Sequence, residues 1–305
     1  MWAALAAGPL AAQAPPLRPG GLLVEPATTR AEALAGAGVA VVGDEGSVFV
    51  NPAGMAPIRR TTLGGSAALG PGDTRFAAAA AVLRIGRFDF GVGAMARDWG
   101  DTITITAPGP GTIAAEDLQS WAGLGAVAAA YRRGLLSVGA TAKALREHVA
   151  DSAGEYWDAV AVTGDVGLAV TVFDIMALGA VMQNLAGTFV EDSVGALALP
   201  RTIRVGYALN MIDPQGEMRL LLTTEWIRPQ GGDSWWALGA EGGMVRSGVG
   251  AVVRAGYAAG RAGADRRAPS FGAGLVLGPL RVDYAWQGWN GGARTSHRIG
   301  ARWAL

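Results

Sequence analysis

The chain has 305 residues, half of them hydrophobic and only 16% charged, with a formal net charge of zero. A soluble domain normally carries about 25% charged residues, and the absence of a basic face argues against nucleic acid as a partner. Cysteine is absent from the sequence, which excludes structural disulfides and thiolate metal sites.

Apolar residues are not gathered into long runs. The longest internal run, from Trp121 to Tyr131, is shorter than the roughly 20 residues that a membrane helix needs. The mean hydropathy is nevertheless high, at +0.28. An apolar chain without helical spans suggests a transmembrane β-barrel, whose signal per strand is weak.

The start of the chain is irregular. Residues 1–14 are apolar and end in Ala12-Gln13-Ala14, an A-x-A pattern typical of a signal-peptide cleavage site. The basic start of such a signal is missing, and Pro15 follows the expected cut directly. We interpret residues 1–14 as a truncated signal peptide, with a disordered tail as the alternative, and residues 15–59 as an irregular N-terminal segment.

Within that segment, Asn51-Pro52-Ala53-Gly54 forms a turn motif. Pro52 fixes its own φ and disfavours a helix at Asn51, the Asn51 side chain can bond nearby backbone amides, and Gly54 permits a turn. The motif is interpreted first as a structural fastening, and direct contact with a ligand is the other reading.

From residue 60 to residue 305 the side chains alternate with a period of two, which indicates β-strands. The clearest case is Leu280–Gln287, where Leu280, Val282 and Tyr284 oppose Arg281 and Asp283. Turn signals separate about 14 such segments, an even number, as closed barrels of this kind require. They lie near residues 60–69, 75–84, 86–97, 119–131, 135–147, 158–170, 174–184, 201–211, 217–228, 234–245, 248–258, 269–277, 279–287 and 296–305. The segments near 119–131 and 174–184 alternate weakly, and the first could instead be a short buried helix.

The alternation fits two architectures. In a soluble sandwich the apolar face forms the core, and in a membrane barrel it meets lipid while the polar face lines the lumen. Segment lengths near the 9–11 residues of a tilted membrane strand favour the barrel, as do tryptophans and tyrosines near segment ends. We therefore expect an all-β, antiparallel transmembrane β-barrel.

Charged residues recur on the face expected to line the lumen. They could line a solute path or simply brace a water-filled interior, and the second reading is favoured. The residues are Arg87, Asp89, Lys143, Asp165, Arg204, Arg219, Glu225, Glu241, Arg254, Arg281 and Asp283.

Catalytic and cofactor motifs are missing from the sequence. The two histidines, His148 and His297, do not have a metal-ligand spacing such as H-E-x-x-H. G-x-S-x-G and G-K-[ST] do not occur, and Gly36–Gly43 lacks the spacing of a nucleotide loop. We expect a protein that is not an enzyme and uses no cofactor or metal.

Short motifs in a fixed order resemble those of the PorV/PorQ branch of the FadL superfamily of outer-membrane barrels. They include the Gly-Ala-rich stretch from Leu34 to Ala40, Asp44-Glu45 and Asn51-Pro52-Ala53-Gly54. Later matches are Ser137–Leu145, Asp165–Leu168, Asn184–Gly187, Pro200–Tyr207, Val252–Tyr257, Phe271–Leu275, Val282–Ala285 and Ser296–Ile299.

The resemblance implies a 14-stranded barrel in the bacterial outer membrane, in contact with its lipid, with the N-terminal segment as a plug in or under the lumen. It implies a PorV/PorQ-type role in export or surface attachment of proteins, through partners in a secretion machinery. The alternative is FadL-like passive transport of small hydrophobic molecules.

Overall fold

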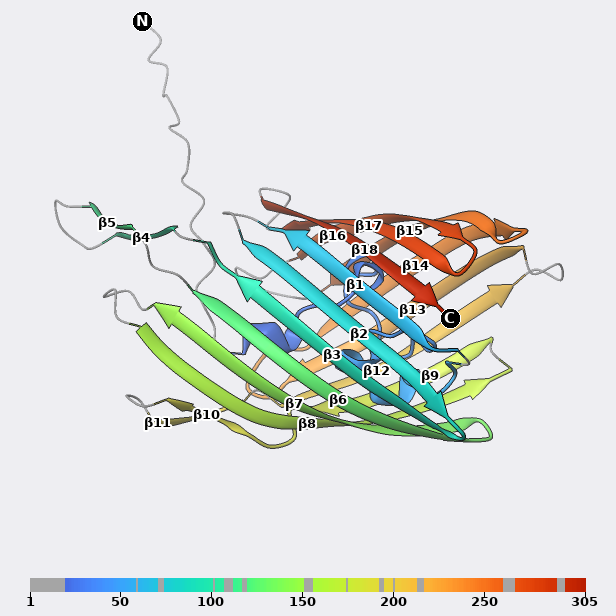
Figure 1. Ribbon diagram of the computed structural model, residues 1–305, viewed down its shortest axis with the longest axis horizontal. Coiled ribbons are helices and arrows are strands. Elements are labelled where there is room, and N and C mark those ends of the chain that lie inside the picture. The colour runs from blue at the N-terminus through green and yellow to red at the C-terminus, as the bar shows by residue number, and fades with distance from the viewer. Residues whose placement is uncertain are drawn as a thin grey trace, which may run out of the picture.

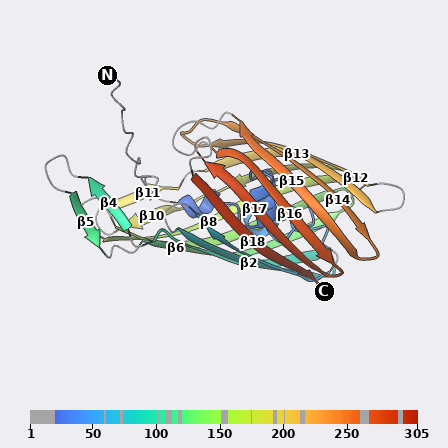
Figure 2. The ribbon, with the colours of Figure 1, turned by 90° about the horizontal axis from the view of Figure 1, so that it is seen from above.

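The structure, a computed structural model, describes residues 20–58, 60–70, 74–100, 102–106, 112–116, 120–150, 156–173, 175–191, 195–199, 201–212, 217–259, 267–289 and 294–305. Within these residues, 14 antiparallel strands form a closed barrel (Figures 1 and 2). The predicted all-β barrel is therefore confirmed. The expected signal peptide, residues 1–14, lies outside the described residues.

The barrel strands lie within a few residues of the predicted segments. In order around the wall they are β1 (Thr62–Leu69), β2 (Arg75–Ile85), β3 (Phe88–Asp98), β6 (Trp121–Arg133), β7 (Leu136–Ala150), β8 (Tyr156–Val172), β9 (Met176–Gln183), β12 (Thr202–Ile212), β13 (Met218–Pro229), β14 (Trp235–Arg246), β15 (Val249–Ala259), β16 (Arg267–Leu277), β17 (Leu280–Trp289) and β18 (Arg294–Ala304). The stretch from Trp121 to Tyr131 is thus a strand, not the alternative buried helix.

The wall closes between its first and last strands. β1 pairs with β18 in one register from Thr62 opposite Ala304 to Leu69 opposite His297, and β8 pairs with β9 on the far side. The closing pair satisfies the backbone groups of the first and last strands, which a lipid environment requires because exposed backbone groups cannot be hydrated there.

The two ends of the barrel differ. Short turns join β2 to β3, β6 to β7, β14 to β15 and β16 to β17 at one end, which we call the short-turn end. At the opposite, long-connection end, two small hairpins lie between the predicted strand segments. They are β4 (Thr102–Thr106) with β5 (Thr112–Glu116) and β10 (Thr188–Glu191) with β11 (Gly195–Ala198).

Large apolar side chains cover the outside of the wall. Val162, Val253 and Ile299 are each more than 60% exposed, on strands spread around the barrel. Such a belt is costly in water and stable in lipid. The outward face is therefore the lipid face, as the alternation predicted.

The N-terminal segment runs inside the barrel (Figures 1 and 2). Its short helices are η1 (Gly21–Val24), α1 (Thr29–Ala33), α2 (Ser47–Val50) and η2 (Pro52–Met55). α1 contacts β15 to β18, and η2 contacts β6, β7 and β8. We call residues 20–58 the inner segment. None of the helices in the described part of the chain could span a membrane.

Glycines in the wall make room for the inner segment. A Cβ atom at Gly179 would lie 2.2 Å from the Val39 carbonyl oxygen, and one at Gly139 would lie 2.7 Å from the Ala53 nitrogen. Backbone atoms cannot yield as a flexible side chain can. The close approach of two backbones therefore requires glycine at these wall positions.

Candidate functional site

The lumen has two chemically different sides. Strands β2, β6 and β8 turn small apolar side chains inward, whereas β12 to β15, β17 and β18 turn charged ones inward. The apolar side, which we call the apolar sector, is formed by Ala78, Ala80, Val82, Ala122, Leu124, Ala126, Ala128, Ala130, Ala159 and Ala161, all of them buried.

Residues of the inner segment pack against the apolar sector in one contact cluster. Leu22 and Leu23 lie at the start of this contact, and Phe49, Met55 and Ile58 continue it. The helix η1, which contains Leu22 and Leu23, contacts β3 and β6. One side of the lumen is therefore apolar along most of its described length.

The turn motif fastens the inner segment to the wall. The Asn51 side chain accepts a hydrogen bond from the Ala53 nitrogen at 3.2 Å and donates to the Val39 and Leu168 carbonyl oxygens, at 2.8 and 3.2 Å. Pro52 packs against Gly139. Gly54 lies in η2, where a Cβ would come within 2.8 Å of the Ser47 hydroxyl. Close packing, not a left-handed φ, therefore explains this glycine.

Polar wall residues bind the carbonyl groups at the end of α2. The Thr141 hydroxyl donates to the Val48 oxygen at 3.1 Å, and Gln183 donates to Phe49 and Val50 at 3.1 and 3.0 Å. Lys143 donates to Phe49 and pairs with Asp165, both side chains being buried. These wall groups satisfy carbonyls that the helix end leaves without a partner.

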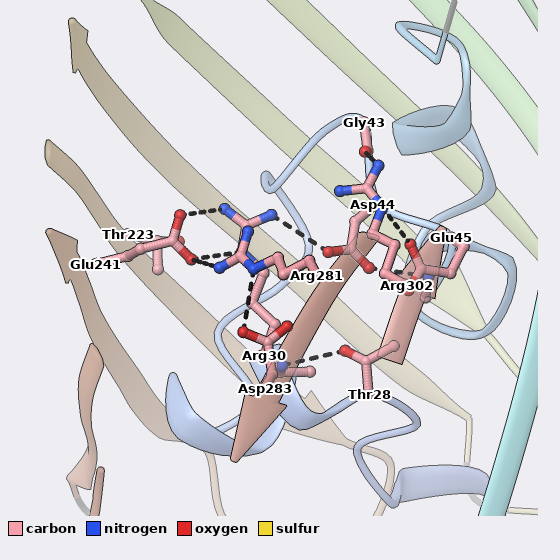
Figure 3. A network of polar contacts seen from close by, with 12 residues as sticks. Thr28, Arg30, Gly43, Asp44, Glu45, Thr223, Glu241, Arg281, Asp283 and Arg302 are labelled. Carbon is pink, nitrogen blue, oxygen red and sulfur yellow. Dashed lines mark hydrogen bonds and ion pairs between the residues drawn. The ribbon is translucent and has the colours of Figure 1, made fainter. Parts of the chain in front are cut away.

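The charged side of the lumen centres on Glu241 (Figure 3). Arg30 of the inner segment reaches it at 2.8 Å, as does Arg254 of the wall, and Arg281 lies at 3.4 Å. Asp283 pairs with Arg254 at 2.9 Å and with Arg281 at 3.0 Å. One arginine of the inner segment thus completes an ion-pair network of three wall strands.

A second contact joins the inner segment to β18. Arg30 pairs with Asp44 at 3.2 Å, and Arg302 pairs with Glu45 at 3.0 Å and donates to the Gly43 carbonyl at 2.8 Å (Figure 3). Burial alone would raise the pKa of Asp44, but Arg30 and Arg302 lower it below its usual value. Asp44 is therefore a stable anionic partner for Arg30.

Two further arginines hold the inner segment. Arg204 pairs with Glu225 and donates to the Gly36 carbonyl at 2.8 Å, while Glu225 accepts from the Gly38 and Val39 nitrogens at 2.8 Å each. Arg298 pairs with Glu25 at 3.3 Å and Glu32 at 3.1 Å and lies 4.2 Å from the Phe76 ring centre. Most of the inward charge therefore binds this segment.

The predicted lumen charges fall into three groups. Lys143, Asp165, Arg204, Glu225, Glu241, Arg254, Arg281 and Asp283 make the contacts above, and Asp89 pairs with Arg84 at 2.8 Å, its side chain fully buried. Arg219 is exposed at the short-turn end, where it lines a cavity. The inward position predicted for Arg87 is wrong, because Arg87 lies exposed in the two-residue turn between Ile85 and Phe88.

Several charged residues of the interior were not among the predicted ones. Arg298 and Arg302 share the polar face of the last strand, so alternation alone could have identified them. Glu147 lies on the same inward face of β7 as the predicted Lys143, so alternation could have identified it as well. The inner-segment partners Arg30, Asp44 and Glu45 lie outside any strand and give no periodic signal.

A cavity of about 320 Å³ opens at the short-turn end. Its walls are mostly apolar, from Val41, Val42, Ile175 and Leu221, and Arg132 and Arg219 stand among them. The interior closer to the Arg30 network holds only about 30 Å³ of free space. Within the described residues, the inner segment therefore fills most of the space near the Arg30 network, and free space opens at the short-turn end.

Comparisons with known proteins bear on the fold. No family model and no curated protein matches the sequence. Among solved structures, the P. putida toluene transporter TodX matches with a TM-score of 0.64 and 12% identity, covering 92% of this chain and 99% of that one. The Ralstonia pickettii toluene transporter TbuX gives 0.61 and 16%, with 92% and 97% coverage. A Pseudomonas aeruginosa FadL homologue gives 0.60 and 15%, with 92% and 99% coverage.

At such low identity the similarity concerns the fold. The chain has the architecture of FadL-like outer-membrane barrels. The particular branch implied by the sequence motifs, PorV/PorQ, is not among these matches.

Proposed function

We propose that this protein is a passive channel for small hydrophobic molecules across the bacterial outer membrane. The observation that carries the proposal is the apolar sector, which packs in one cluster with apolar residues of the inner segment, from Leu22 near the long-connection end to Ile58. A channel for ions or sugars has a polar lumen. The solved barrels with the same fold include toluene transporters.

In this proposal the inner segment controls passage. Leu22 and Leu23 occupy the apolar sector, with exposed fractions of 0% and 5%. A solute passing along the sector has to displace them or pass through space that they vacate. Removing their side chains therefore opens the path, and adding bulk to the wall opposite narrows it.

The test measures entry of a hydrophobic fluorophore, N-phenyl-1-naphthylamine, into cells whose outer membrane carries the protein. We expect faster entry than in cells without it, still faster entry with Leu22→Ala/Leu23→Ala, and slower entry with Ala122→Trp. Ala129→Trp is the matched control, because Ala129 faces outward on the same strand. Equal entry with and without correctly inserted protein would refute the channel.

A PorV/PorQ-type role in secretion is the other prediction from the sequence, and it needs a protein partner. Outside the barrel, the described part of the chain offers only two short hairpins, β4–β5 and β10–β11, at the long-connection end. The apolar sector gives no support to a docking role. We therefore place hydrophobic transport first.

A further inference from the structure

One carboxylate interrupts the apolar sector. Glu147 lies on β7, directly between Ala122 of β6 and Ala159 of β8 in the strand register. Both alanines are buried, and Glu147 itself is 1% exposed. A charge in such surroundings is costly unless it receives hydrogen bonds from a partner.

The only polar partner of Glu147 in the described part of the chain is a single backbone group. The Gly20 nitrogen donates to both carboxylate oxygens, at 3.0 and 3.1 Å. By contrast, Glu241 and Glu225 are held by arginines. A carboxylate can accept about four hydrogen bonds, so Glu147 has acceptor capacity that this one amide does not use.

The start of the inner segment contacts Glu147 and the surrounding alanines in the way that a bound ligand would. Gly20 supplies one N–H donor, and Leu22 and Leu23 supply an apolar body that packs against the alanines of the sector. Among the described residues there is open space beside it, because a Cβ placed on Gly21 would meet none of their atoms within 4 Å. A small molecule with the same two features fits the same surroundings.

We propose that Glu147 and the alanines around it bind a hydrophobic solute that carries one N–H or O–H donor, such as a phenol. The start of the inner segment occupies this site when no solute is present. The inference rests on the proposed transport function and narrows its substrate class. A plain hydrocarbon can fill the apolar surroundings but cannot satisfy the carboxylate.

The test compares two probes of nearly equal shape, 1-naphthol and naphthalene, binding to the purified full chain in detergent. A hydrogen bond to a charged acceptor contributes enough to favour 1-naphthol by about tenfold. We expect Glu147→Ala to remove this preference and Glu147→Gln, which keeps an acceptor, to retain part of it. Asp158→Asn is the control, because Asp158 is an exposed carboxylate on the neighbouring strand.

The outcomes distinguish failure of the Glu147 site from failure of hydrophobic transport. Equal binding of both probes, unchanged by Glu147→Ala, would overturn the assignment of Glu147 and leave hydrophobic transport standing. Binding of neither probe would overturn both. Leu22→Ala/Leu23→Ala should strengthen binding of both probes without changing their ratio, since it weakens the apolar packing of the occupant and leaves the carboxylate. Heat-dependent gel mobility verifies that each variant forms a barrel.

Discussion

Arg30 is the residue through which the inner segment joins the ion-pair network of the wall. Its replacement by methionine leaves Glu241 and Asp44 buried with one cation fewer. Breaking a buried pair costs up to 3–5 kcal/mol. Because Arg254 still reaches Glu241 at 2.8 Å, we expect Arg30→Met to lose about 2–3 kcal/mol, measured by urea unfolding in detergent.

Arg146→Met is the control for this measurement. Arg146 pairs with Asp158 at 3.4 Å, and both side chains are about half exposed. Exposed pairs contribute about 0–1 kcal/mol, so this variant should unfold close to wild type. A loss of equal size in both variants would show that the Arg30 network has no special role.

Glu45 gives the inner segment a pH dependence. Burial and the nearby Asp44 carboxylate raise the pKa of Glu45 to about 7, although Arg302 acts in the opposite direction. In the unfolded chain the Glu45 carboxyl loses its proton near pH 4.5. The stability gained from the raised pKa is therefore complete below pH 4.5 and is lost as the pH rises to about 7.

We expect Glu45→Gln to flatten this part of the stability profile. Wild type should hold its inner segment less tightly at pH 8 than at pH 5, seen as faster cleavage within residues 20–58 by a nonspecific protease. The variant should show a smaller difference between the two pH values. An equal difference in both proteins would mean that another group titrates.

At the scale of elements, the wall glycines determine whether the inner segment can lie where it does. A methyl group at Gly179 would meet the backbone of Val39 and Ala40. Forcing extra volume into a packed contact costs about 1–3 kcal/mol. We expect Gly179→Ala to displace the segment from the wall and to speed its cleavage by protease while leaving the barrel folded.

Gly125→Ala is the matched control, because Gly125 is exposed and a Cβ there meets no atom within 4 Å. Its protease pattern should equal that of wild type. If Gly179→Ala behaved in the same way, the contact between β9 and the inner segment would have to be looser than the structure shows.

Alternation identified the barrel strands because lipid on one side and a polar lumen on the other impose a period of two. The same rule explains the weak segment near 119–131. On β6 the inward Ala126 and Ala128 are as apolar as the outward Val127, so the pattern has little contrast. Arg87 was misplaced because a two-residue turn, residues 86–87, makes β3 begin at Phe88, two positions later than predicted.

Contacts between the inner segment and the wall lay beyond prediction from a single sequence. Arg30 and Glu241 are 211 positions apart, and only the closed fold brings them together. The hairpins β4–β5 and β10–β11 were not predicted, because they lie between the segments in which alternation was found. The bond between the Asn51 side chain and the Ala53 nitrogen is of the kind that a single sequence can suggest, because it spans only two positions along the chain.

At the scale of the whole molecule, closure depends on the pairing of β1 with β18. Ala67 lies directly opposite Ile299 in this pair, and both face outward. Directly opposite residues have Cβ atoms about 4.5–5.5 Å apart, whereas diagonal neighbours are farther. The chain has no cysteine of its own, so two introduced cysteines can form a disulfide only with each other within one chain.

We expect Ala67→Cys/Ile299→Cys to form a disulfide on oxidation, because small adjustments bring this spacing within disulfide range. The crosslink ties the two ends of the wall, so the boiled, unreduced protein should migrate as a more compact species than the reduced one. Ala67→Cys/Ala301→Cys is the control, since Ala301 lies opposite Gly65. If the control pair formed a disulfide in preference to the direct pair, β1 would lie against β18 in a shifted register. The apolar and charged sides of the lumen would then not be aligned as described.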